Sequence, residues 1–264
     1  MIPYFTQPKL EMGPLTFHAF GALVVMAILV GSHFIRKRTD DQGLDADISY
    51  NMVTWVLVGG FIGSHLVEVL VYHPEKLEKD PWALLKVWEG MSSFGGYLGA
   101  ITATILFFHR YLPGDMKWRY VDVVVWGFPF GWIFGRTGCT VALDHPGLPT
   151  TFFLGFMRKN GQAIHNLGLY EMLYTVLIAL LFWSLRKRPA YSGFYAGLFC
   201  VLYGPVRFGL DMLRTADVHY GGLTPGQWGS IALSVLGLWL MYYRKQVGDY
   251  GPWHPRDAEV SAAT

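Results

Sequence analysis

The sequence predicts an all-α, polytopic membrane protein with seven transmembrane helices, its N-terminus outside and its C-terminus in the cytoplasm. Three observations support this prediction: an apolar composition, seven long apolar segments, and basic residues gathered in alternate connections between those segments. Hydrophobic residues make up 52% of the 264-residue chain, aromatic residues 16% and charged residues only 15%. Average soluble domains carry roughly 25% charged residues, so the composition argues against a soluble globular protein.

Seven segments are apolar and nearly long enough to cross the hydrocarbon core of a bilayer, which takes about 20 helical residues. They span residues 16–35, 50–72, 92–110, 119–137, 168–185, 193–213 and 226–243. Lys9 and Glu11 precede the first segment without a cleavage site, so we expect that segment to remain as a helix rather than to be removed as a leader. Residues 1–245 would then form a single seven-helix transmembrane domain, and residues 246–264 a polar C-terminal tail.

Basic residues gather on one side of this predicted domain. They follow the first segment, lie between the third and fourth and between the fifth and sixth, and follow the seventh. More than half of the 21 Lys and Arg residues lie there: Arg36, Lys37, Arg38, Arg110, Lys117, Arg119, Arg186, Lys187, Arg188, Arg244, Lys245 and Arg256. The positive-inside rule makes this side cytoplasmic, which requires an odd number of spans and an outside N-terminus.

The connection at residues 138–167 is long for a compact membrane protein, and such loops tend to be functional. Arg136 precedes it, where an apolar helix would leave the bilayer, and Asp144 and His145 follow within nine residues. Charged groups at this depth are costly in lipid, so they should face a protein interior or a wet cavity. The alternative interpretation is an interfacial arginine whose side chain snorkels to the lipid headgroups.

A second group of charges lies in the sixth segment. Arg207, Asp211 and Arg214 are spaced i, i+4 and i+7, so they share one helix face. One interpretation is an internal Arg–Asp pair that neutralises itself, as intramembrane charges commonly do. With Arg136, however, three guanidiniums gather at the outer membrane edge, and guanidinium is the preferred bidentate partner of phosphate. The pattern therefore favours a phospholipid headgroup as ligand.

The starts of three segments carry small or polar residues with both structural and functional interpretations. Gly95 and Gly96 open the third segment, where they permit close helix packing or leave backbone N–H groups available to an anion. Glu171 lies in the first turn of the fifth segment, where a carboxylate suits the helix dipole. Gln227 begins the seventh segment, in a turn typical of a capped, proline-started helix.

Several functional classes lack support in the sequence. Cys139 and Cys200 form neither a disulfide framework nor a zinc-binding spacing, so we expect no metal. The net charge of +2 and the absence of a basic cluster argue against a nucleic-acid partner. The chain has no nucleophile elbow, no P-loop and no His-Glu-Xaa-Xaa-His element, which argues against a serine hydrolase, an NTPase or a zinc protease. We expect no cofactor.

Four ordered stretches match the motifs of one family. Residues 135–144 match a Gly-Arg-Xaa-Gly-Asn-Phe-Xaa-Asn-Xaa-Glu signature, and residues 88–96 match Trp-Asp-Gly-Gly-Xaa-Ser-Phe-His-Gly-Gly with one residue fewer. Residues 165–171 match His-Pro-Ser-Gln-Leu-Tyr-Glu in part, and residues 203–214 match Tyr-Gly-Xaa-Xaa-Arg-Phe…Glu-Xaa-Xaa-Arg. From residue 13 to residue 227, the chain thus resembles the bacterial prolipoprotein diacylglyceryl transferase family, which also has seven spans and an outside N-terminus.

The chain also departs from these motifs. Phe94 stands where the family has a histidine, Cys139 and Ala142 replace two asparagines, and Asp144 replaces a glutamate. Residues 166–168 read Asn-Leu-Gly in place of Pro-Ser-Gln. The arginines are retained while several polar groups are missing, so the chain is expected to be a divergent member.

The resemblance implies transfer of a diacylglyceryl group from phosphatidylglycerol to the lipobox cysteine in the signal peptide of a prolipoprotein. It also implies a bacterial cytoplasmic (inner) membrane location among membrane lipids, with the active site towards the outer leaflet. Arg136 and Arg207 match the family arginines and would clamp the phosphate, with Asp144 and Asp211 orienting them. Tyr203 would donate to phosphate or glyceryl oxygens.

Because Phe94 cannot accept a proton, a histidine elsewhere on the outer side is expected to do so. The predicted catalytic residues are Arg136, Arg207, Tyr203, His145 and His165. The predicted substrate-binding residues are Gly95, Gly96, Gly135, Gly138, Asp144, Glu171, Asp211, Arg214 and Gln227. Two alternatives stay open. One is an enzyme of the same fold with a different acceptor or headgroup reaction, which Phe94 and Cys139 favour. The other is a non-catalytic phospholipid-binding or transport protein.

Overall fold

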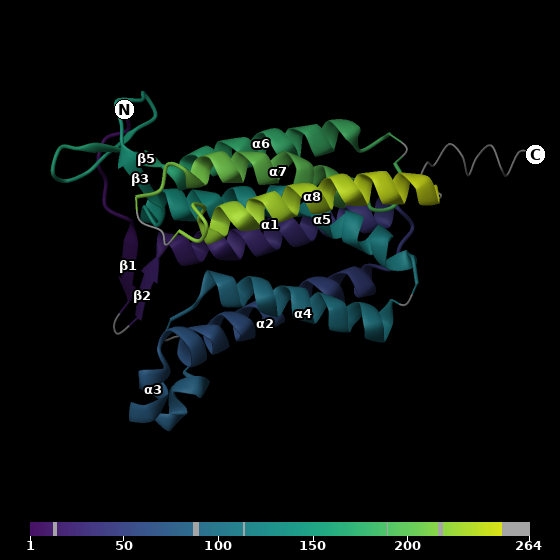
Figure 1. The fold of residues 1–264 in the computed structure, drawn as a ribbon, viewed down its shortest axis with the longest axis horizontal. Coiled ribbons are helices and arrows are strands. Elements are labelled where there is room, and N and C mark those ends of the chain that lie inside the picture. Colours follow the sequence, from purple (N-terminus) through teal and green to yellow (C-terminus); the bar gives the residue numbers. More distant parts are fainter. Residues whose placement is uncertain (13–14, 87–89, 113, 189, 216–218, 250–264) are drawn as a thin grey trace, which may run out of the picture. The chain divides into compact units, whose positions relative to one another are not determined.

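The computed structural model describes residues 1–12, 15–86, 90–112, 114–188, 190–215 and 219–249 (Figure 1). Most of this chain is helical, and seven long helices overlap the seven apolar segments predicted above. They are α1 (Ala19–Asp41), α2 (Ala46–Val67), α4 (Ser93–Tyr111), α5 (Met116–Ala142), α6 (Leu167–Leu185), α7 (Phe194–Asp211) and α8 (Pro225–Val247). Short helical stretches follow α2: η1 (Glu68–Tyr72), α3 (Pro74–Lys79) and η2 (Pro81–Leu85).

Two small β-sheets depart from the all-α prediction. β1 (Lys9–Met12) and β2 (Leu15–His18) form an antiparallel hairpin, so α1 begins at Ala19 rather than at the predicted residue 16. β3 (Pro146–Pro149), β4 (Phe156–Met157) and β5 (Ala163–Asn166) form a three-stranded sheet in the order β3-β5-β4. This sheet occupies much of the predicted loop at 138–167, whose first residues instead extend α5 to Ala142.

The described residues belong to two compact units. The first unit comprises residues 1–43 and 121–264, and the second comprises residues 44–120. A single domain over residues 1–245 therefore remains a prediction. Of the predicted tail, the structure describes residues up to 249, and α8 reaches Val247.

An aromatic and aliphatic core stabilises the first unit. Trp126 of α5, Ile178 and Phe182 of α6, and Tyr195 of α7 are all at most 2% exposed and pack together. Such burial of large apolar side chains is worth about 1.5–3 kcal/mol each. Polar contacts also stabilise this core, since Trp126 Nε1 donates to Phe182 O at 3.1 Å and the Tyr195 hydroxyl donates to Leu185 O at 3.0 Å. These contacts hold α5, α6 and α7 together along the helices that carry the site described below.

Close backbone packing joins α2 and α4 in the second unit. A Cβ added at Gly63 would lie 2.6 Å from Gly95 O and 2.7 Å from Gly99 Cα, so only glycine permits this approach. His65 is buried beside these helices, with Nε2 3.1 Å from Ala83 O. Its place is structural, holding the segment after α2.

Three described helical stretches are long and apolar enough to cross a membrane: Ala19–Asp41, Ala46–Tyr72 and Leu167–Leu185. Together with the apolar composition they identify a membrane protein. The seven-span count and the sides on which the termini lie remain predictions, which are taken up with the proposed function.

Candidate active site

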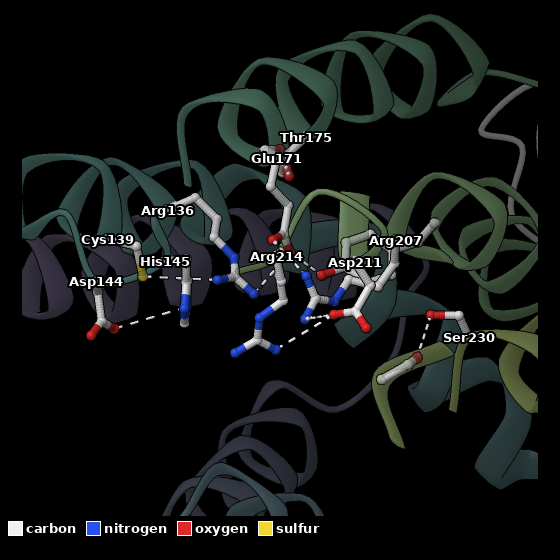
Figure 2. A network of polar contacts seen from close by, with 12 residues as sticks. Arg136, Cys139, Asp144, His145, Glu171, Thr175, Arg207, Asp211, Arg214 and Ser230 are labelled. Atoms are coloured by element: carbon white, nitrogen blue, oxygen red, sulfur yellow. Dashed lines mark hydrogen bonds and ion pairs between the residues drawn. The ribbon is translucent and has the colours of Figure 1, made fainter. Parts of the chain in front are cut away.

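A chain of alternating guanidinium and carboxylate groups lies in the first unit, where the end of α5, the start of α6 and the end of α7 meet (Figure 2). Its members are Arg136, Glu171, Arg207, Asp211 and Arg214, and we call these five residues the ion-pair network. The structure thus brings together charged side chains that lie as far apart as residues 136 and 214.

Glu171 is the centre of this network. Its side chain is 2% exposed, with Oε1 2.8 Å from Arg136 Nη2 and Oε2 3.9 Å from Arg207 Nη1. The Tyr203 hydroxyl donates to the same Oε1. A buried carboxylate is costly unless it is paired and hydrogen-bonded, and here it is both. The helix-dipole account of Glu171 was therefore incomplete, because the carboxylate joins two arginines from different helices.

Arg136 is held from several sides. Its side chain is 8% exposed, and its guanidinium carbon lies 4.5 Å from the centroid of the Trp132 ring. Nη1 lies 3.8 Å from Cys139 Sγ, while Nε is buried without a hydrogen-bond partner among the described residues. The snorkelling interpretation was wrong, since the guanidinium points into the protein and pairs with Glu171.

Asp211 holds the other two arginines. Its Oδ1 lies 3.4 Å from Arg207 Nη2 and 3.4 Å from Arg214 Nη1, as the sequence spacing predicts for one helix face. Its Oδ2 accepts a hydrogen bond from the Thr224 hydroxyl at the start of α8. Both arginines are thus oriented by a carboxylate that is itself anchored to a neighbouring helix.

The network presents partly exposed guanidiniums to a ligand. Three guanidiniums share two buried carboxylates, those of Glu171 and Asp211. The side chains of Arg207 and Arg214 are 23% and 31% exposed, so they remain accessible to a ligand, whereas Arg136 is nearly closed off. The arrangement can therefore bind an anion through charge-assisted hydrogen bonds.

Asp144 occupies a different place from the one expected. The ion pairs of Arg136 and Arg207 go to Glu171 and Asp211, while the Asp144 carboxylate lies 3.8 Å from His145 Nε2. The sequence motif suggested an acid after the arginine, but α5 ends at Ala142 and the chain then turns away. The group that holds Arg136 comes instead from α6.

The two predicted histidines have separate surroundings. Burial lowers the pKa of His145, and the guanidiniums of the network lower it further, while Asp144 partly opposes the shift. Its imidazole is therefore neutral near pH 7. His165 lies on β5, where Nδ1 is 2.9 Å from the Tyr170 hydroxyl. Because Leu167 N donates to His145 O at 3.3 Å, His145 lies beside the start of α6, near Glu171.

Asn166 has a role that the sequence analysis missed. Its Oδ1 accepts from Leu169 N at 3.1 Å and so caps α6, while its Nδ2 donates to Thr140 O at 3.0 Å. The side chain thereby joins the end of α5 to the start of α6 and keeps Arg136 beside Glu171. An asparagine directly before an apolar helix is a recognised N-cap signal, which could have identified it.

Three predicted substrate-binding residues of the first unit, Gly135, Gly138 and Gln227, lie against other groups of the protein. A Cβ at Gly138 would lie 3.1 Å from the Phe20 ring, so this glycine lets α1 pack against α5. Gly135 is less crowded, with the Trp132 ring 3.6 Å from the same added atom. Gln227 completes a capping box, because its Oε1 accepts from Thr224 N at 3.0 Å. Gly138 and Gln227 therefore shape the scaffold around the ion-pair network.

Gly95 and Gly96 lie in the second unit. Gly95 N donates to Ser92 Oγ at 3.2 Å and Gly96 N donates to Ser92 O at 2.9 Å. Both N–H groups are thus already bonded at the start of α4, which argues against the anion-binding interpretation of these two amides. Phe94 beside them is exposed.

Comparisons with known proteins agree with the motifs. A sequence model of the family described as prolipoprotein diacylglyceryl transferase matches residues 8–243. The chain is 30% identical over 258 residues to the phosphatidylglycerol–prolipoprotein diacylglyceryl transferase of Solidesulfovibrio magneticus, covering 92% of this chain and 96% of the relative. Proteins of the same name from Nitratidesulfovibrio vulgaris and Acinetobacter baumannii are 33% and 27% identical, covering 90% and 95% of this chain and 94% and 97% of the relatives.

Proposed function

The chain belongs to the prolipoprotein diacylglyceryl transferase family, and from this premise we propose that it transfers a diacylglyceryl group from phosphatidylglycerol to a cysteine of a prolipoprotein. The family match extends over most of the chain, and relatives named for this reaction align over nearly their whole length. The acceptor is the lipobox cysteine of the prolipoprotein signal peptide. No cofactor is needed, because both substrates carry the reacting groups.

The observation that carries the proposal is the gathering of three guanidiniums in the ion-pair network, two of them, Arg207 and Arg214, partly exposed. The phosphodiester of phosphatidylglycerol bears one negative charge, which these guanidiniums can receive through charge-assisted hydrogen bonds. The partly exposed Arg207 and Arg214 present bidentate donors to this phosphate.

The reaction follows from these charges. The acceptor thiolate attacks the glyceryl carbon that carries the phosphate, because the thiolate and not the thiol is the nucleophile. A carbon–sulfur bond forms, the carbon–oxygen bond to the phosphate breaks, and glycerol phosphate leaves with the electron pair. Negative charge grows on the departing phosphate, where fixed guanidiniums stabilise it without having to reorient. Arg136 and Arg207 are the phosphate clamp of this proposal. In the present conformation Arg207 and Arg214 are the accessible members, and Arg136 reaches the phosphate from its buried place beside Glu171.

Glu171 and Asp211 keep the clamp rigid. Each carboxylate contacts two guanidiniums, so the arginines are oriented before the lipid binds. Tyr203 donates its hydroxyl to Glu171, which makes it an orienting group in this conformation as well as the predicted donor to the lipid.

The thiol proton needs an acceptor. His145 lies near the network, and its lowered pKa keeps the imidazole neutral at pH 7, as a base must be. His165 is the second candidate, although one of its nitrogens already lies within hydrogen-bond distance of the Tyr170 hydroxyl. His145 is therefore the preferred acceptor.

The proposal includes the membrane topology. Seven spans place the N-terminus outside, the C-terminus in the cytoplasm and the ion-pair network towards the outer leaflet of the bacterial inner membrane. Support comes from the seven long helices and from the basic residues in the last turns of α1 and directly after α6. In this arrangement the phosphate clamp is at the depth of a lipid headgroup.

The test combines purified protein, phosphatidylglycerol and a lipobox peptide. Mass spectrometry should show the peptide gaining one diacylglyceryl group, with glycerol phosphate released in equal amount. A peptide with serine in place of its cysteine is the matched control and should remain unchanged. Release of headgroup without peptide modification would favour a different acceptor. The absence of both products would favour a lipid-binding protein that is not an enzyme.

A further inference from the structure

Cys139, Asp144 and His145 bring three metal-ligating side chains together just beyond the ion-pair network (Figure 2). One ligand atom from each, a thiol sulfur, a carboxylate oxygen and an imidazole nitrogen, lies within 4.8 Å of the other two. We propose that these residues form a binding site for a soft divalent cation of the zinc class. This inference goes beyond lipid transfer. Because a metal-bound His145 cannot accept a proton, the proton transfer assigned to His145 above is that of the metal-free protein.

The spacing is close to that of a zinc site. Bonds of about 2.0–2.3 Å in a tetrahedron put ligand atoms about 3.3–3.7 Å from one another. His145 Nε2 and Asp144 Oδ2 are already 3.8 Å apart, and the remaining separations need to shorten by at most about 1.5 Å. The side chains of Asp144 and His145 are 57% and 30% exposed, so rotation of these side chains can close the distance. Three protein ligands leave a fourth position for water.

The backbone after α5 builds the cluster. Leu143 has φ 53°, a left-handed conformation that is uncommon for a residue with a side chain. The turn is fixed by a hydrogen bond from Asp144 N to Cys139 O at 3.2 Å. This reversal, held at a non-glycine residue, brings positions 144 and 145 back beside position 139.

Charge and ligand type select the cation. The Cys139 thiolate and the Asp144 carboxylate supply two negative charges, and the thiol proton passes to solvent on binding. Arg136 Nη1 is 3.8 Å from the sulfur, but its charge is paired with Glu171 at 2.8 Å. Mg²⁺ and Ca²⁺ prefer oxygen ligands, whereas sulfur and imidazole nitrogen together favour Zn²⁺ and its substitutes Co²⁺ and Cd²⁺.

The experiment is a Co²⁺ titration of the full-length protein in detergent after removal of metals. We expect one equivalent to bind, with a sulfur-to-cobalt charge-transfer band and the intense visible bands of a tetrahedral site, both lost when Zn²⁺ is added. Cys139→Ser should abolish the charge-transfer band, and His145→Gln or Asp144→Asn should weaken binding by at least about tenfold. Cys200→Ser, which removes the only other cysteine, is the matched control and should bind as the unmodified protein does.

Three results would overturn the proposal: no charge-transfer band, a band that survives Cys139→Ser, or a band lost in Cys200→Ser. Because Cys139 is partly buried, its variant could lose the fold, so thermal unfolding is compared for each variant. The exposed Asp144 provides a second, independent variant, and unchanged affinity in Asp144→Asn together with His145→Gln would reject the site. Lipid transfer is measured separately, so failure of either proposal is recognised on its own.

Discussion

Glu171 on α6 and Arg136 on α5 form a buried ion pair, with 2.8 Å between Oε1 and Nη2 and both side chains at most 8% exposed. Because the other oxygen of Glu171 faces Arg207, this one carboxylate connects three helices. Removal of either partner leaves the other as a buried charge without its counter-ion.

Glu171→Gln should destabilise the protein as well as inactivate it. The amide keeps the shape of the side chain but leaves Arg136 buried without its counter-charge, which costs on the order of 3–5 kcal/mol. Thermal unfolding in detergent and lipid transfer are the two measurements. Glu75→Gln in the second unit, where the side chain is 55% exposed, is the control and should change neither. A fully stable Glu171→Gln protein would show that the pair is not structural.

Arg136→Ala and Arg207→Ala should each abolish turnover while the protein still inserts in the membrane. Loss of one charge-assisted contact to the departing phosphate costs on the order of 2–4 kcal/mol in the transition state, about 30- to 10³-fold in rate. Arginine-to-lysine changes should also fail, because lysine lacks the bidentate fork. Arg158→Ala, an exposed arginine between β4 and β5, is the control. Full activity in either alanine variant of the network would remove the phosphate clamp.

His145→Gln should lower the transfer rate by about 10²–10⁴, the usual size of a general-base contribution. The family places a histidine where Phe94 stands here, so Phe94→His in the His145→Gln background should restore part of the rate. His165→Gln is the comparison. If both histidine variants keep full activity, the proton goes to another group, and an acceptor that needs no thiol activation becomes the better proposal.

The lowered pKa of His145 also predicts a pH-dependent stability. An unfolded histidine has a pKa near 6.5. Above that pH, His145 is neutral in both the folded and the unfolded protein, so it adds no pH dependence to the free energy of unfolding. As the pH falls below about 6.5, the unfolded chain takes up the proton first and the folded protein loses stability relative to it. Unfolding measured between pH 5 and 8 should show this loss, and His145→Gln should reduce it. An equal slope in the variant would mean that other groups cause it.

The topology predicts which cysteines an impermeant thiol reagent reaches from outside. In a background without the native cysteines, Asn160→Cys should react in intact cells. Lys37→Cys and Lys187→Cys should react only after the membrane is opened, because both lie among the basic residues of the predicted cytoplasmic side, at the end of α1 and after α6. Labelling of position 187 from outside would reject the arrangement of seven spans with the N-terminus outside.

The sequence predicted the long helices and the arginines because both depend on local signals. Apolar segments of about 20 residues and charges at i, i+4 and i+7 are visible without knowledge of the fold. Asp211 accordingly pairs with Arg207 and Arg214 as the spacing suggested. The contacts of Glu171 with Arg136 and of Asn166 with Thr140 were not predicted. Both partners lie on another helix, and nothing in the local sequence identifies such a contact.

The three-stranded sheet was not predicted for a related reason. Its strands contain two to four residues and include Pro146 and Pro149, so they show no alternation of apolar and polar residues from which a strand can be recognised. Their pairing depends on β5 lying between β3 and β4, which is a property of the folded chain.

The Thr224 hydroxyl both accepts a hydrogen bond from Gln227 N and donates one to Asp211, so it belongs at once to the first turn of α8 and to the ion-pair network. A phosphate bound to Arg207 shares the positive charge that Asp211 faces, which leaves that carboxylate a stronger acceptor and tightens its bond to Thr224. Amide hydrogen exchange in the first turn of α8 should then slow when lipid is bound. Amide exchange at the start of α8 would thus report whether a headgroup is bound. The measurement needs no label and can be made in a membrane where the lipid itself is present in excess.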